Sequence, residues 1–229
     1  MTKKRIYKTT FNTYSVYQYA LFSAICCFLE LINSFNSTII LSVQINFGAN
    51  MRITGGTLCG RIIKCPDGII RPAMDRMRES LFSILGDLSG KSFLDLFAGS
   101  GVLSLEAASR GASHIVLVEK DKIKVNTIFE NVSISPVKIQ CHFMPVELFI
   151  MRNKEQFDYI FLDPPFPYKF HQDLILKCSK TNALKPGGTL LIHRPAEKKL
   201  DEKIGNLIRT DHRVYGRSEV DFYSVDKNS

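Results

Sequence analysis

Residues 92–101 read Ser-Phe-Leu-Asp-Leu-Phe-Ala-Gly-Ser-Gly, and the architecture expected for the rest of the chain follows from them. The short apolar run 92–97 is closed by a turn with two glycines, and residues 102–108 continue with the apolar spacing of a helix. Strand, glycine turn and helix in this order open a unit of a parallel α/β sheet. Glycines at 99 and 101 let the backbone approach a ligand closely, and the following helix presents its free amide groups at the same place.

The alternation of strand and helix continues on both sides of this segment. The segments 211–215 and 219–225 flank Gly216-Arg217-Ser218 without a helix, so they are expected to pair antiparallel. Short connections elsewhere predict an open, mostly parallel sheet covered on both faces. The predicted fold class is therefore α/β, a doubly wound, Rossmann-like sheet with a C-terminal antiparallel hairpin. We expect the other strands at 114–118, 137–143, 157–162 and 189–193, and helices at 75–85, 122–132, 145–152 and 170–184.

The composition is that of a folded chain with an atypical start. Of 229 residues, 45% are hydrophobic and 23% are charged, which excludes an intrinsically disordered chain. Residues 1–50 show neither helix caps nor a regular apolar period and predict a poorly structured leader, as translation of an AT-rich stretch upstream of a start codon at Met51 would give. Residues 51–72 hold two short runs between glycine turns and predict a hairpin-like appendage, which leaves 73–229 as the main domain.

Cysteine usage and hydropathy favour a cytoplasmic protein. The six cysteines form no Cys-x-x-Cys pair and have no histidine at ligand spacing, so we expect reduced thiols and no bound metal. The five histidines form no spaced set, and we expect structural roles for them. The longest uncharged apolar stretch, Val16–Leu29, is shorter than the roughly 18 residues of a membrane span, so no span is predicted.

Two acidic residues extend the glycine turn into a nucleoside-binding pattern. Glu119 follows the second expected strand, where a carboxylate can accept two hydrogen bonds from a ribose diol. Asp95 precedes the turn, and Ser104 stands where pyridine-nucleotide enzymes usually have a third glycine. An acid at Asp95 favours a ligand with a cationic ammonium group over a pyrophosphate, and S-adenosylmethionine is such a ligand. A purely structural turn and a solvated strand end are the alternatives.

The sequence Asp163-Pro164-Pro165-Phe166 ends another expected strand and predicts a preorganised acceptor site. The prolines fix the backbone, so the Asp163 side chain and the Pro164 carbonyl are held in set directions. Two such oxygens suit the two hydrogens of an exocyclic nucleobase amine, whose lone pair can then turn toward a methyl donor. The base must be unpaired or flipped out, and Phe166 can stack on it. The alternative is a rigid strand exit with Phe166 in the core.

From Met51 to about residue 225, the chain resembles the bacterial RsmD-type methyltransferases, which make N2-methylguanine in small-subunit (16S) ribosomal RNA. The resemblance implies that Asp163, Pro164 and Phe166 hold the guanine and that the start at Met51 is the natural one. It further implies that S-adenosylmethionine is bound by Asp95, Gly99, Ser100, Gly101 and Glu119. The matching segments are 51–56 (Met-Arg-Ile-Thr-Gly-Gly), 71–79 (Arg-Pro-Ala-Met-Asp-Arg-Met-Arg-Glu), 94–107, 163–166 and 215–218 (Tyr-Gly-Arg-Ser).

Positive charge is concentrated between residues 52 and 78, a segment that contains six basic residues and two acidic ones. Such a cluster is typical of a phosphate-binding surface, although solvated arginines are the alternative. The chain has no room for a separate recognition domain, so we expect a monomer that acts on a folded target such as a small-subunit assembly particle. A methylase of another amine, such as adenine N6 in DNA or RNA, and a non-catalytic RNA-binding assembly protein remain open. The predicted RNA contacts are Arg52, Arg61, Arg71, Arg76 and Arg78.

Overall fold

The computed structural model describes residues 51–65 and 72–226, with side chains described from residue 75 onward in the second range. The predicted leader, residues 1–50, and the predicted RNA contact Arg71 lie outside the described residues. Within the described ranges, no helix combines the length and the apolar character that crossing a bilayer requires.

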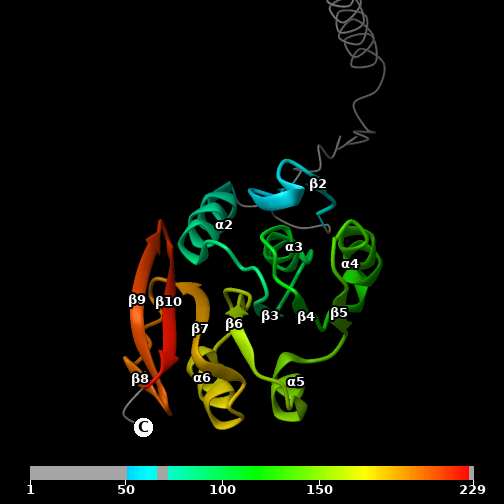
Figure 1. The fold of residues 1–229 in the computed structure, drawn as a ribbon. Coiled ribbons are helices and arrows are strands. Elements are labelled where there is room, and N and C mark those ends of the chain that lie inside the picture. The colour runs from blue at the N-terminus through cyan, green and yellow to red at the C-terminus, as the bar shows by residue number, and fades with distance from the viewer. Residues whose placement is uncertain (1–50, 66–71, 227–229) are drawn as a thin grey trace, which may run out of the picture. The chain divides into compact units, whose positions relative to one another are not determined.

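The main sheet has eight strands among the described residues, in the order β5-β4-β3-β6-β7-β10-β9-β8 (Figure 1). Strands β5, β4, β3, β6 and β7 run parallel, whereas β10 lies antiparallel to both β7 and β9. The predicted doubly wound sheet with a C-terminal antiparallel hairpin is thus confirmed. The strands are β3 (Ser92–Leu96), β4 (His114–Val118), β5 (Ile139–His142), β6 (Phe157–Leu162), β7 (Leu184–Pro195), β8 (Lys203–Ile204), β9 (Leu207–Tyr215) and β10 (Ser218–Val225).

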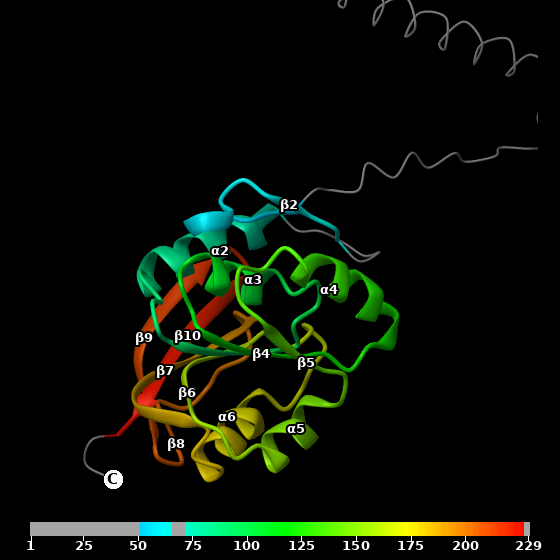
Figure 2. The same cartoon turned by 45° about the vertical axis from the view of Figure 1, so that its right-hand side comes forward.

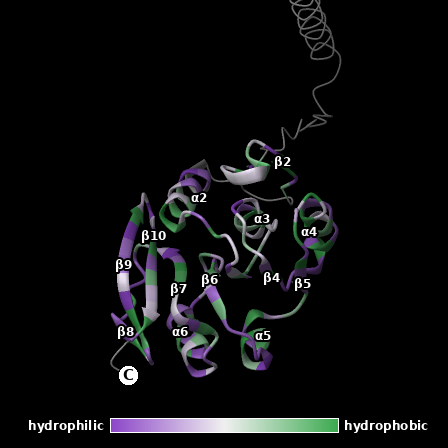
Figure 3. Ribbon diagram, viewed as in Figure 1, coloured by the Kyte–Doolittle hydropathy of each residue, from purple (hydrophilic) through white to green (hydrophobic). Residues whose placement is uncertain are grey.

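Helices cover both faces of the sheet. Helices α2 (Pro72–Leu85), α3 (Val102–Ser109) and α4 (Val125–Val132) lie on one face, and α5 (Val146–Arg152) and α6 (His171–Lys180) lie on the other (Figures 1 and 2). Each face has its own core, because successive residues of β3 point to opposite sides: Phe93 packs with α2 and α3, whereas Leu94 packs with α5 and α6. Hydrophilic and hydrophobic residues share the surfaces of α2, α4 and α6 (Figure 3), as expected of helices that cover a sheet.

The first described residues form the predicted hairpin. Strand β1 (Met51–Arg52) pairs antiparallel with β2 (Ile62–Ile63), and the 3₁₀ turn η1 (Gly56–Leu58) lies between them. Ile53 and Ile63 are buried in the same core as helices α2 and α3. The hairpin is therefore packed against the main domain through its own apolar side chains.

Several boundaries differ from the expected ones, among them the start of β9 at Leu207 and the additional strand β8, and three differences have a local reason. The helix expected over 170–184 ends at Lys180, because Asn182 adopts a φ of +50° and Leu184 already pairs with β6. Strand β7 extends beyond 189–193 in both directions and tolerates Pro186 and its two following glycines through a register shift against β6. The helix expected from Lys122 begins with the 3₁₀ turn η2 (Lys122–Lys124).

Candidate active site

The predicted cofactor turn and the predicted acceptor site lie side by side. Strands β3 and β6 are parallel neighbours. The strands that follow β3 in the chain, β4 and β5, lie on one side of this pair, and β7, which follows β6, lies on the other. The carboxyl ends of β3 and β6 are therefore the switch point where ligands bind in such sheets. The Asp163 amide, just past β6, donates to the Leu96 carbonyl at the end of β3 at 3.2 Å. The Gly99 amide in the turn donates to Glu119 Oε2, just past β4, at 2.9 Å. Residues from three neighbouring strand ends thus share one location.

Asp95 has one carboxylate oxygen without a hydrogen-bond partner among the described residues. Its side chain is fully buried, and Oδ2 accepts hydrogen bonds from the Ser104 amide at 3.1 Å and the Ser104 hydroxyl at 2.7 Å. Oδ1 is also buried and has no hydrogen-bond partner among the described residues. Burial raises the pKa of Asp95 to about 7, and the nearby carboxylates of Asp163 and Glu119 act in the same direction. A cationic group placed here would stabilise the ionised carboxylate and satisfy Oδ1.

The glycine turn adopts a conformation that favours glycine. Gly99 and Gly101 have φ angles of +59° and +79°, and a side chain built on Gly99 would meet nothing within 4 Å. Phe97 also has a positive φ, +67°, which is uncommon for a bulky residue. Ser100 is buried, and its carbonyl accepts from Asn131 Nδ2 at 2.9 Å. The open space over Gly99 lets a ligand approach the turn backbone.

Glu119 both holds the turn and keeps capacity for a ligand. Its Oε2 accepts from the Gly99 amide and, at 3.3 Å, from Lys124 Nζ, while Oε1 accepts from the Asp121 amide at 2.9 Å. A carboxylate offers about four acceptor positions, so one remains at Oε1, and displacement of the Lys124 side chain, which is 30% exposed, would free a second.

Asp163 presents one bonded oxygen and one open oxygen. Its Oδ1 lies 2.7 Å from Nδ1 of His193, and its Oδ2 has no hydrogen bond among the described residues. The side chain of Asp163 is 20% exposed, so Oδ2 can reach a substrate. Pro164 is buried beside it, and the half-buried Phe166 packs its ring edge-to-face with that of His193 at 5.7 Å between centroids.

His193 is a site residue that the sequence reasoning missed, because the histidines were expected to have structural roles only. Leu162 pairs with Ile192 in the parallel register of β6 and β7. The residues that follow them, Asp163 and His193, therefore also lie side by side. Aligning the carboxyl ends of neighbouring strands, rather than searching for spaced histidines, would have found it.

The loop after Phe166 is fastened to both sides of the site. The Tyr168 hydroxyl donates to Glu147 Oε1 on α5 at 2.7 Å, and the Tyr168 ring packs edge-to-face on Phe97 at 5.5 Å between centroids. The acceptor segment and the cofactor turn are thus joined through an aromatic contact. The described residues contain no cluster of three His, Cys, Asp or Glu that could hold a metal ion.

The predicted RNA contacts divide into exposed and buried residues. Arg52, Arg61 and Arg76 are exposed. Arg78 is only 3% exposed, and each of its guanidinium nitrogens is engaged: Nε with Glu106 at 2.9 Å, Nη1 with Asp75 at 3.0 Å and Nη2 with the Arg52 carbonyl at 2.7 Å. The prediction that Arg78 contacts RNA is therefore corrected, since this side chain is too deeply buried to reach a phosphate.

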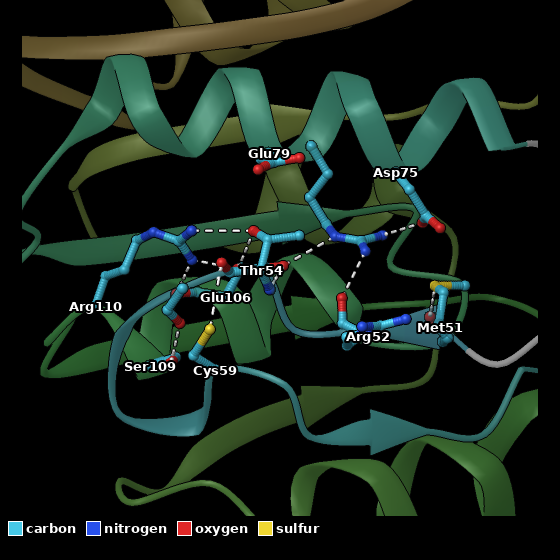
Figure 4. Close-up of polar contacts among 12 residues, drawn as sticks. Met51, Arg52, Thr54, Cys59, Asp75, Glu79, Glu106, Ser109 and Arg110 are labelled. Carbon is cyan, nitrogen blue, oxygen red and sulfur yellow. Dashed lines mark hydrogen bonds and ion pairs between the residues drawn. The ribbon is translucent and has the colours of Figure 1, made fainter.

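Arg78 belongs instead to a buried group that we call the Glu106 cluster, formed by Thr54, Arg78, Glu106 and Arg110. The fully buried Glu106 carboxylate accepts from the Thr54 amide at 2.7 Å, from the Thr54 hydroxyl at 3.0 Å, and from Arg78 and Arg110 (Figure 4). The adjoining Gly56, with φ +75°, lies so close to α3 that an added Cβ would be 1.9 Å from a backbone oxygen. The motif at residues 51–56 therefore docks the hairpin onto α3.

Comparisons with known proteins identify the family of this chain. YlbH of Bacillus subtilis (strain 168) is 31% identical over 180 residues, which are 76% of this chain and 98% of that protein. "Ribosomal RNA small subunit methyltransferase D" of Haemophilus influenzae is 30% identical over 166 residues, 68% of this chain and 84% of the relative. The solved structure of yhhF from Escherichia coli superimposes with a TM-score of 0.71 at 28% identity, covering 77% of this chain and 98% of that one. The family model described as conserved hypothetical protein 95 matches residues 51–224, so the chain belongs to this family, that of the RsmD-type methyltransferases.

Proposed function

We propose that this protein transfers a methyl group from S-adenosylmethionine to the exocyclic N2 of a guanine in small-subunit ribosomal RNA. The observation that carries the proposal is the pairing, at one switch point, of an open acceptor oxygen on Asp163 with an unsatisfied buried carboxylate on Asp95. The first accepts from an amine that reacts, and the second binds a cationic cofactor. The name of the Haemophilus influenzae relative supports ribosomal RNA as the substrate.

The residues around the glycine turn fit S-adenosylmethionine. Its ammonium group would satisfy Asp95 Oδ1, and its ribose hydroxyls would use the remaining acceptor positions of Glu119. Gly99, Ser100 and Gly101 form a turn whose backbone the ligand can approach closely, since the space above Gly99 is open. When bound, the cofactor supplies a methyl group already activated by its sulfonium.

The chain's own contribution to the reaction is alignment. Asp163 Oδ2 and the Pro164 carbonyl accept the two N–H groups of the guanine amine, which turns the nitrogen lone pair toward the methyl carbon. The Asp163 carboxylate would stabilise the positive charge that develops on the nitrogen when it accepts the methyl group, and the proton that the nitrogen then loses would pass to water. Phe166 stacks on the base, a contact worth about 1–3 kcal/mol.

The exposed arginines of the hairpin and of helix α2 provide the RNA-binding surface in this proposal. The hairpin lies next to the cofactor turn, because the Met51 sulfur is 3.8 Å from the Ser100 hydroxyl and Asn131 bonds both the Lys64 backbone and the Ser100 carbonyl. Phosphates held by Arg52, Arg61 and Arg76 would therefore flank the reacting base. We propose further that the protein acts as a cytoplasmic monomer on an assembly particle of the small subunit.

The decisive experiment is nucleoside mass spectrometry of ribosomal RNA from cells that lack the protein, complemented with variants. Loss of N2-methylguanosine, restored by the wild type but not by Asp163→Ala, is the expected result. Asp211→Ala is the matched control, because Asp211 is a partly exposed aspartate of β9 paired with Arg213. Loss of N6-methyladenosine instead would transfer the activity to adenine, and full methylation by Asp163→Ala would refute the catalytic role.

RNA binding is tested separately by filter binding. Replacing Arg52 and Arg61 together with alanine is expected to weaken RNA affinity and its salt dependence without changing the affinity for S-adenosylmethionine. Arg213→Ala is the control, because this exposed arginine lies on β9 in the C-terminal hairpin. Equal RNA affinity of both variants would contradict the assignment of the hairpin.

A further inference from the structure

His193 is built into the site in a way that its burial alone does not explain. The residue is 2% exposed, and its only hydrogen bond among the described residues joins Nδ1 to Asp163 Oδ1 at 2.7 Å. Its other ring nitrogen, Nε2, is buried without a partner in the described part of the chain. An apolar residue would fill the same space without leaving a polar atom unpaired, so the feature that burial does not explain is the hydrogen bond from the ring to Asp163.

We propose that His193 is a positioning residue that donates a hydrogen bond from Nδ1 to Asp163 Oδ1 and thereby directs Oδ2 toward the substrate amine. This inference rests on the proposed function of Asp163. With Oδ1 held from the β7 side and the backbone fixed by Pro164, the carboxylate has one orientation in which it can accept from the amine. Donation from Nδ1 places the lone pair of a neutral ring on Nε2, so the buried unpartnered atom is an acceptor and not a stranded donor.

Among the described neighbours of His193, Asp163 is the residue that forms a hydrogen bond with its ring. The neighbouring Arg194 points its guanidinium to the other side, where it pairs with Asp221 and Glu219. Phe166 packs edge-to-face on the imidazole ring, so the same histidine touches both the acceptor carboxylate and the stacking ring. A shift of His193 would therefore displace two of the groups that hold the base.

The test compares two substitutions that differ in hydrogen bonding. His193→Leu fills the space without a donor, whereas the amide nitrogen of His193→Asn occupies nearly the place of Nδ1 and can donate to Asp163. We expect His193→Leu to lower kcat by about 10- to 100-fold, as a misplaced reacting group does. The affinity for S-adenosylmethionine, measured by calorimetry, should stay unchanged, and His193→Asn should restore most of kcat.

A matched control is His171→Leu. His171 is also 2% exposed and also has a buried, unpartnered Nε2, but it packs on Tyr168 and makes no contact with Asp163. It should lose stability to a similar degree as His193→Leu while keeping kcat. If His193→Leu and His193→Asn lower kcat equally, or if the loss follows melting temperature in all three variants, the positioning role is refuted.

A spectroscopic readout is independent of turnover. In protein labelled with ¹⁵N at histidine, the His193 ring is expected to show a protonated Nδ1 and an unprotonated Nε2, and Asp163→Asn should alter this pattern. The opposite tautomer in the wild type would overturn the inference. Should Asp163→Ala remain active, the proposed function itself fails, whereas an inactive Asp163→Ala beside a fully active His193→Leu removes only the role of His193.

Discussion

Replacing Glu106 with glutamine should destabilise the protein strongly, although the side chain keeps its size. The carboxylate is fully buried and accepts four hydrogen bonds, two from Thr54 and one each from Arg78 and Arg110. Glutamine turns one oxygen into a donor that faces other donors, leaves Arg110 without the carboxylate it pairs with, and leaves Arg78 with Asp75 alone. Breaking a buried ion pair in this way typically costs about 3–5 kcal/mol, and the 13% exposure of Arg110 places the loss near the lower value, about 3 kcal/mol.

Thermal unfolding followed by circular dichroism measures this loss. For a domain of this size, about 3 kcal/mol corresponds to a decrease in melting temperature of roughly 6–12 °C. The control is Glu130→Gln, which removes an ion pair with Lys64 whose side chains are 54% and 66% exposed and which should contribute less than about 1 kcal/mol. Hydrogen exchange should also show faster exchange of the Thr54 amide in the Glu106 variant. A melting temperature equal to that of the Glu130 variant would refute the role of the Glu106 cluster.

Three further outcomes are expected. Gly56→Ala should cost more than the roughly 1–2 kcal/mol of a left-handed alanine because its Cβ would overlap a backbone oxygen of α3, whereas Gly60→Ala, with φ +81° and open space, should cost only that amount in denaturant unfolding. The Kd for S-adenosylmethionine should rise about fivefold from pH 7 to pH 6, because the buried Asp95 with its pKa of about 7 must release a proton to take the ammonium; calorimetry on Asp95→Asn should show no such dependence. Tyr168→Phe should lose about 1 kcal/mol of stability in the same unfolding assay, since the bond to Glu147 disappears without a change in ring packing.

The order of the elements could be predicted because each carries a local signal. The glycine turn after Leu96, the short apolar strands and the turn before Ser218 identified the parallel sheet and its antiparallel end. Since parallel strands bring their carboxyl ends to one edge, the sequence also predicted that Asp163 and the glycine turn would lie together. Their hydrogen-bonded contact between strands β6 and β3 agrees with that expectation.

The partners of individual charged side chains could not be predicted, because they depend on packing between distant segments. Arg78 lies in a basic stretch whose composition predicts surface arginines. The side chain is nevertheless buried, where it pairs with Glu106, 28 residues away in sequence. His193 carries no motif, and its contact with Asp163 follows only from the register of β6 against β7. Charge counting therefore identified the basic stretch but could not tell that Arg78, unlike Arg52, Arg61 and Arg76, is buried.

The position of β7 in the sheet has a consequence for synthesis on the ribosome. β7 pairs with β6 on one side and with the later strand β10 on the other. At a synthesis rate of about 5–20 residues per second, the backbone groups along the outer edge of this apolar strand stay unpaired for a few seconds until β10 emerges. A nascent chain stalled or cleaved before β10 exposes a long hydrophobic edge, the usual template for edge-to-edge aggregation, so premature termination late in translation should yield insoluble protein rather than a shortened enzyme.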